Sequence, residues 1–176
     1  MRCAVLLVTM VTVTSSAVVA QDREAARTDY FRSVAGFFSV PMSEIAILSD
    51  WDLRPEEIPV VLFMARRAGI SPEALVALRS GGRSWASLAD RYLVTASTLH
   101  VPIRDEASAG ALSVAYSQYR QTPVGGWSTI RLTDADIIAL VNVRVIAQAL
   151  GVSAEEVLRR TASTLTFVEL HAQLKR

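Results

Sequence analysis

Residues that begin and end helices recur along this chain, and they restrict its fold more than any other feature of the sequence. Ser71-Pro72-Glu73 supplies a capping hydroxyl, a proline at the first helical position and an acid in the first turn. Gly69 and Gly81-Gly82 end helices on either side of it, and Gly151 ends a later helix that opens at Thr133. No segment alternates convincingly between apolar and polar residues, as a half-buried strand would. The sequence therefore predicts an all-α fold, a bundle of short helices.

Apolar residues spaced by three and four place the helices between these signals. The β-branched residues within 141–145 leave some possibility of a strand there. Residues 100–131 are the least regular part of the chain, and we expect any functional loop to lie there. The expected helices cover residues 23–39, a short stretch after Pro41, 55–67, 71–81, 85–93, 106–121, 133–150, a stretch from Ser153, and 166–175.

A shift of 82 residues aligns two parts of the chain without a gap. It places residues 69–76 on 151–158, Ser84-Trp85 on Thr166-Phe167, and Leu88 on Leu170. The register predicts an internal duplication of a three-helix unit, although short capped helices resemble one another in any case. The expected organisation is N-terminal helices in residues 21–52, unit 1 in 53–99, a connecting region in 100–131, and unit 2 in 132–176.

The first twenty residues have the layout of a cleaved secretory signal peptide. Met1-Arg2 is a short positive start, an apolar run follows, and Val18-Val19-Ala20 ends on a small residue before the polar Gln21. The alternative is an N-terminal membrane anchor, but Thr and Ser residues interrupt the apolar stretch of about 18 residues that an anchor needs. We expect an exported protein, periplasmic or secreted. Cys3 is the only cysteine, so the mature chain has no thiol for a disulfide or a metal.

Removal of residues 1–20 takes away Arg2 and no acid, which leaves 17 basic and 17 acidic side chains. A chain without net charge has no long-range attraction for nucleic acid. We therefore do not expect a nucleic-acid partner.

A resemblance supports the exported, helical interpretation. Glu57-Ile58-Pro59-Val60 leads through Ala65-Arg66-Arg67-Ala68 to Ser71-Pro72-Glu73 and to the run Leu78-Arg79-Ser80-Gly81-Gly82-Arg83-Ser84-Trp85. These residues resemble an uncharacterised family of small exported bacterial helical proteins, and Ile130-Arg131-Leu132-Thr133-Asp134 does so more loosely. The resemblance implies a bacterial helical protein and implies no catalytic or ligand residue.

Only two histidines could serve as a catalytic base or a metal ligand. His171 lies on the apolar-striped last helix, where we interpret it as structural. His100 lies in a loop before Pro102 and is the candidate general base of an envelope hydrolase or lyase, although no Gly-x-Ser-x-Gly motif accompanies it. The sequence predicts no cofactor and no metal site.

Two further patterns have simple structural explanations. Asp50, Asp52, Glu56 and Glu57 lie close together, but they lack the spacing of a calcium loop and are explained as acids near the start of a helix. Residues Ser84 to Leu99 resemble a DNA-binding helix-turn-helix, with Leu93 where the turn glycine is expected. A helix-turn-helix-like nucleic-acid binder is therefore an alternative function.

Aromatic residues gather beside flexible backbone in the connecting region. Tyr116, Tyr119 and Trp127 surround Pro123-Val124-Gly125-Gly126, a combination common in binding sites and also in pinned linkers. The sequence predicts a non-enzymatic interaction module of the bacterial envelope that holds a protein or peptide partner. The candidate binding residues are Tyr116, Tyr119, Trp127, His100 and Arg83.

Overall fold

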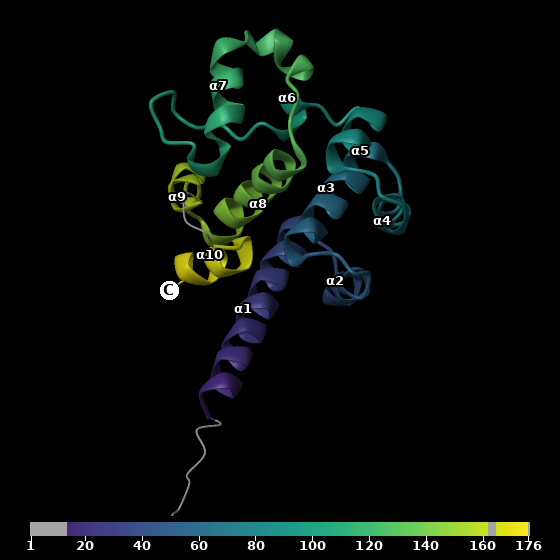
Figure 1. Ribbon diagram of the computed structural model, residues 1–176, viewed down its shortest axis with the longest axis vertical. Helices are drawn as coiled ribbons and strands as arrows, with labels where there is room; N and C mark the ends of the chain where they lie inside the picture. Colours follow the sequence, from purple (N-terminus) through teal and green to yellow (C-terminus); the bar gives the residue numbers. More distant parts are fainter. Residues whose placement is uncertain (1–13, 162–164, 176) are drawn as a thin grey trace, which may run out of the picture.

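The prediction of an all-α fold is confirmed. The computed structural model describes residues 14–161 and 165–175, and it contains no strand within those ranges (Figure 1). The α-helices are α1 (Thr14–Phe38), α2 (Met42–Ser49), α3 (Ile58–Ala68), α4 (Pro72–Ser80), α5 (Trp85–Arg91), α6 (Ala96–Leu99), α7 (Ser113–Gln121), α8 (Asp134–Leu150), α9 (Ala154–Arg160) and α10 (Phe167–Leu174). Three short 3₁₀ turns join them: η1 (Pro55–Glu57), η2 (Gly110–Leu112) and η3 (Val124–Thr129).

Helix α8 forms the centre of the fold, with α1 and α3 packed along it (Figure 1). Most of α8 between Ile137 and Ile146 is buried, and so is most of α3. Burial of this apolar surface is the main term that holds the helices together. The β-branched residues 141–145 lie within α8, so the possibility of a strand there is not realised. Helix-forming ends explain why: Thr133 and Asp136 form a reciprocal capping box, and Gly151 ends the helix.

The two predicted units have matching helix ends. Gly69 and Gly151 both adopt the left-handed conformation, with φ of 68° and 65°. Ser71 and Ser153 cap α4 and α9 with the same backbone angles. The third helix of each unit also packs near the start of the other unit's first helix: α5 against α8, and α10 against η1. Helix ends of unrelated origin can match in this way, so the duplication stays a prediction.

The predicted helix over residues 106–121 begins later than expected. Helical structure starts only at η2 and continues as α7. Gly110 causes the break, because its φ is +53° and a Cβ placed there would lie 2.0 Å from the carbonyl oxygen of Leu158. The chain turns at this point to pass close against α9, and an α-helix cannot continue through that backbone conformation.

Residues 1–13 of the predicted signal peptide lie outside the described residues. Helix α1 starts at Thr14 and runs through the predicted cleavage point after Ala20 without a break. The first turns of α1 extend beyond the rest of the fold (Figure 1). Within the described ranges, no helix is both long enough and apolar enough to cross a membrane.

Candidate functional site

Four of the five predicted binding residues come together in one aromatic cluster. The ring of His100 lies 4.2 Å from that of Trp127 and 4.7 Å from that of Tyr119, measured between centroids. Tyr116 contacts both His100 and Tyr119 at 5.8 and 5.6 Å. The cluster joins α6, α7 and η3, which are otherwise short elements with little surface to bury.

The hydroxyl groups and the indole N–H of the cluster donate hydrogen bonds to backbone carbonyls. Tyr116 donates its hydroxyl to the carbonyl of Val101 at 2.5 Å, and Tyr119 donates to Ala96 at 2.8 Å. The indole N–H of Trp127 is shared between the carbonyls of Tyr119 and Thr122. Both tyrosines are 2% exposed. The cluster therefore packs α6, α7 and η3 together, and the hydroxyl groups of Tyr116 and Tyr119 are not available to a partner.

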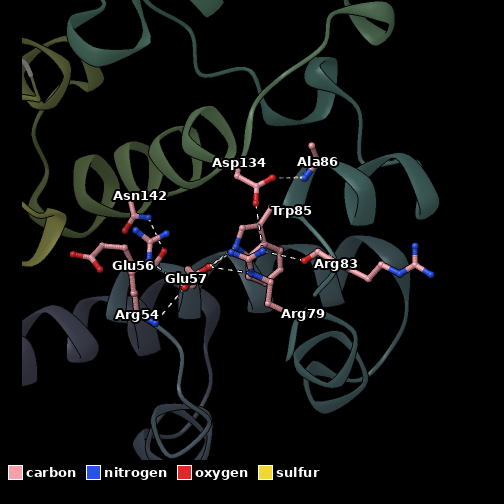
Figure 2. A network of polar contacts seen from close by, with 9 residues as sticks. All are labelled: Arg54, Glu56, Glu57, Arg79, Arg83, Trp85, Ala86, Asp134 and Asn142. Carbon is pink, nitrogen blue, oxygen red and sulfur yellow. Dashed lines mark hydrogen bonds and ion pairs between the residues drawn. The ribbon is translucent and has the colours of Figure 1, made fainter. Parts of the chain in front are cut away.

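Arg83 lies apart from the aromatic cluster. Its side chain is exposed and points away from the neighbouring polar residues, while its carbonyl accepts a hydrogen bond from Arg79 (Figure 2). Arg83 therefore does not join the other four candidate binding residues. Of the other four, Tyr116 and Tyr119 are buried, whereas His100 and Trp127 are half-buried and keep part of their surface exposed.

His100 is half-buried between aromatic rings. Burial lowers the pKa of His100, and the positive charge of Arg144 lowers it further. Arg144 donates to the carbonyls of Thr98, Leu99 and His100, which closes the end of α6. No hydrogen bond within the described ranges joins the imidazole to a side chain that it could activate, so this geometry gives no support to a general base.

The segment resembling a helix-turn-helix does turn sharply at the expected position. Leu93 has φ of +56° and is 81% exposed, although a glycine is the usual residue for that conformation. The helix that follows, α6, is only four residues long and two of them, Ala96 and Leu99, are buried. A helix this short cannot present several side chains to the bases of a groove.

A concave surface lies between the α5–α6 turn and residues 128–132. Its volume is about 350 Å³. Small side chains leave the hollow open: Ala86, Ala89 and Ala96 lie where larger residues would fill it. The rest of the lining is mixed, with leucine, isoleucine and valine side chains beside the hydroxyl groups of Thr95, Ser128 and Thr129. The ion pair between Asp90 and Arg131, at 2.8 Å, lies at its edge. We call this hollow the α5–α6 groove. Its lining residues are Ala86, Ala89, Asp90, Leu93, Val94, Thr95, Ala96, Leu99, Ser128, Thr129, Ile130, Arg131, Leu132 and Ile137.

The backbone beside the groove is extended and unpaired. Ile130 is 9% exposed, Arg131 is exposed and Leu132 is half-buried, which is the alternation of a strand. Among the described residues, no hydrogen bond engages the N–H of Arg131 or Leu132, or the carbonyls of residues 130–132. The groove thus combines a partly apolar hollow with main-chain donors and acceptors that have no partner in the described part of the chain.

A buried polar network fixes the opposite wall of the groove (Figure 2). Glu57 is 5% exposed and accepts hydrogen bonds from Trp85 at 2.8 Å and from Arg79 at 2.8 and 3.2 Å. Arg79 also pairs with Asp134, whose carboxylate accepts from the backbone N–H of Ala86 at 2.9 Å. This chain of contacts ties the start of α5, one wall of the groove, to the start of α8.

The electrostatics of Glu57 follow from these contacts. Burial raises the pKa of its carboxyl, but the hydrogen bonds from Trp85, Arg79 and Arg54 outweigh burial, so the pKa lies below its ordinary value. Glu57 therefore stays ionised in the folded protein at neutral pH. The sequence interpretation of Glu57 as an acid near a helix start missed this role. Arg79 and Trp85 lie 22 and 28 residues further along the chain, and no local pattern links them to Glu57.

Further polar contacts connect α1 to the core. Tyr30 donates its hydroxyl to Asn142, and Asn142 donates to the carbonyls of Glu56 and Ile138 at 2.9 and 2.8 Å. His171 is fully buried, with Nε2 2.8 Å from the hydroxyl of Ser33. Asn142 is thus a bonded polar group among apolar helices, as buried polar side chains usually are. His171 is bonded only through Nε2, because its buried Nδ1 has no partner among the described residues.

Comparisons with known proteins do not extend this description. No family model matches the chain, and neither a curated protein nor a solved structure matches it. The resemblance seen in residues 57–85 therefore stays a prediction. Over the described ranges, no three His, Cys, Asp or Glu side chains are grouped so that they could hold a metal ion.

Proposed function

We propose that this protein is a non-enzymatic interaction module whose α5–α6 groove binds an extended, apolar peptide segment of a partner protein. The observation that carries the proposal is the apolar hollow beside the unpaired backbone of residues 130–132. A peptide that runs alongside this backbone gains main-chain hydrogen bonds, and its alternate side chains enter the hollow. Affinity comes from the first interaction and selectivity from the second.

The size and charge of the groove limit what can enter it. Its volume of about 350 Å³ is near the lower end of the range of ~300–1,000 Å³ for ligand pockets. One or two apolar side chains therefore fit, and a folded surface does not. Asp90 and Arg131 neutralise each other at the edge, so we expect little selection for charge in the partner.

Export is part of the same proposal. The apolar start of the chain supports a secretory signal, and export would bring the groove into contact with proteins of the bacterial envelope. Partners would then be unfolded or flexible segments of envelope proteins, because those expose extended apolar backbone.

A peptide-selection experiment tests the proposal. The purified protein is used to select peptides from a random library displayed on phage, and each selected peptide is measured by titration calorimetry. Ser128→Trp blocks the groove from an exposed lining position. Ser80→Trp, at an exposed position of α4 outside the groove, is the matched control.

We expect the selected peptides to be rich in apolar residues and to lose at least ten-fold in affinity for Ser128→Trp while they keep it for Ser80→Trp. The proposal fails if no peptide is enriched, or if both variants bind as tightly as the original protein.

A further inference from the structure

A second cavity, separate from the α5–α6 groove, lies between the first half of α1 and α10. Its volume is about 490 Å³. Val19 and Ala26 of α1 contribute apolar surface on one side, and Val168 and Ala172 of α10 contribute it on the other. Leu165 and Pro55 complete the apolar lining. We call this cavity the α1–α10 pocket. Val19 precedes the predicted cleavage point, and all other residues that line the α1–α10 pocket follow that point.

Arg27 gives this apolar pocket an unsatisfied positive charge. Its Nε is buried and has no hydrogen-bond partner. Its guanidinium lies over the ring of Phe31, 5.2 Å from the centroid, and forms no ion pair within the described ranges. A half-buried cation with a free donor is costly unless a counter-ion meets it. The Nε itself is covered, so an anion in the pocket would meet the terminal nitrogens of the guanidinium, which are not buried and form no hydrogen bond or ion pair within the described ranges.

The other charges of the pocket do not supply such an anion. Glu169 is committed elsewhere, because its carboxylate accepts from the backbone N–H and the hydroxyl of Thr166 at 2.9 and 3.0 Å. Arg23 lies near Glu169 and helps to hold its pKa below the ordinary value, after the two bonds from Thr166. Asp22 is exposed at the pocket and makes no ion pair with a described residue. Neither Arg23 nor Arg27 forms an ion pair with a described residue, but Arg23 is exposed to solvent, whereas Arg27 is half-buried and its Nε has no hydrogen-bond partner.

We propose that the α1–α10 pocket binds a single-chain amphiphile with an anionic head, such as a fatty carboxylate or an alkyl phosphate. The head would accept hydrogen bonds from Arg27, whose planar guanidinium suits carboxylate and phosphate oxygens equally. The tail would lie between Ala26 and the α10 residues Val168 and Ala172. Burial of the tail supplies affinity, and Arg27 selects the sign of the head.

The experiment compares amphiphiles that share a twelve-carbon tail and differ in the head. Dodecanoate and dodecyl phosphate are titrated into the purified protein by calorimetry, below their micelle concentrations, beside dodecyltrimethylammonium and acetate. Arg27→Gln removes the charge in the pocket. Arg32→Gln is the matched control, since Arg32 is on the same helix, is 64% exposed and pairs with Asp29. Circular dichroism verifies that both variants keep their helices.

We expect dodecanoate, dodecyl phosphate or both to bind one-to-one, with at least ten-fold weaker binding of the cationic amphiphile and no binding of acetate. Arg27→Gln should weaken binding at least ten-fold, and Arg32→Gln should leave it within two-fold. Equal losses in the two variants, unsaturable binding or no binding of either anionic probe would overturn the proposal.

Vesicle flotation separates a free amphiphile from a lipid bilayer as the source of the anionic head. We expect the protein to stay in the soluble fraction when mixed with vesicles of phosphatidylcholine and phosphatidylglycerol. Co-flotation that Arg27→Gln abolishes would mean a membrane surface is the ligand, and would overturn the assignment to a single-chain amphiphile.

Discussion

Replacement of Glu57 by Gln tests whether the buried network holds α5 against the core. The substitution keeps the shape of the side chain and an oxygen that can accept from the indole of Trp85. It removes the charge that Arg79 meets through two hydrogen bonds, at 2.8 and 3.2 Å. Arg79 is 26% exposed and still pairs with Asp134, so water and that acid recover part of the loss.

The expected cost follows from the same contacts. Removal of one partner from a fully buried ion pair lowers the free energy of unfolding by about 3–5 kcal/mol. Because Arg79 is partly exposed and water can solvate it, we expect Glu57→Gln to lower the free energy of unfolding by about 2–3 kcal/mol. For a chain of this size each 1 kcal/mol lowers the melting temperature by about 2–4 °C, so Glu57→Gln should lower it by roughly 4–12 °C. Urea unfolding followed by circular dichroism measures the free energy of unfolding directly.

Glu56 offers a matched control one residue away. Its carboxylate makes no hydrogen bond or ion pair with a described residue, so Glu56→Gln should change stability by less than about 0.5 kcal/mol. The difference in the free energy of unfolding between Glu57→Gln and Glu56→Gln should also become smaller at acid pH. Because the pKa of Glu57 is lowered on folding, its stabilisation is present above its ordinary pKa of 4.5 and is lost as the pH falls through the folded-state value. Equal stability of the two variants at pH 7 would refute this account of the network.

Three smaller perturbations test other parts of the fold. Leu93→Gly should raise the free energy of unfolding by about 0.5–1 kcal/mol in urea titrations, because an exposed leucine at φ +56° is strained and loses little burial; no gain would mean that the turn is not strained. Gly110→Ala should lower it by about 2 kcal/mol or more, since the new Cβ would clash with Leu158, and a neutral result would contradict the close approach of the two segments. Burial lowers the pKa of His171, Lys175 adds to the effect and Asp29 opposes it, so stability should fall as the pH drops below the ordinary value of 6.5. His171→Gln should remove part of that fall between pH 6.5 and 5 in thermal melts, and an unchanged pH profile would show that the histidine does not contribute.

Local sequence signals predicted helix ends better than they predicted sites. Ser71, Thr133 and Gly151 act at the positions expected of them, because capping depends on a few neighbouring residues. Gly110 had no such signal: its backbone conformation is required by a carbonyl of α9, far away in the sequence. The late start of the helix near residue 110 could not be read from local residues for that reason.

The candidate site shows the same division. Aromatic residues near a segment rich in glycine and proline led to the prediction of one site that contains His100, Tyr116, Tyr119 and Trp127. The structure brings these four residues together. Their hydroxyl and indole groups bond inward, which depends on how the helices pack and not on the residue types. The hollow beside them is made by alanines and by unpaired backbone, and neither leaves a distinctive trace in a sequence.

Amide hydrogen exchange at residues 130–132 tests the central claim most directly. The measurement uses nuclear magnetic resonance on the purified protein, with and without a peptide selected as described above. The groove account predicts that the N–H groups of Arg131 and Leu132, which have no partner among the described residues, exchange more slowly when the peptide is bound. Peptide binding that leaves both amides unprotected, or that protects only amides outside the α5–α6 groove, would contradict the account.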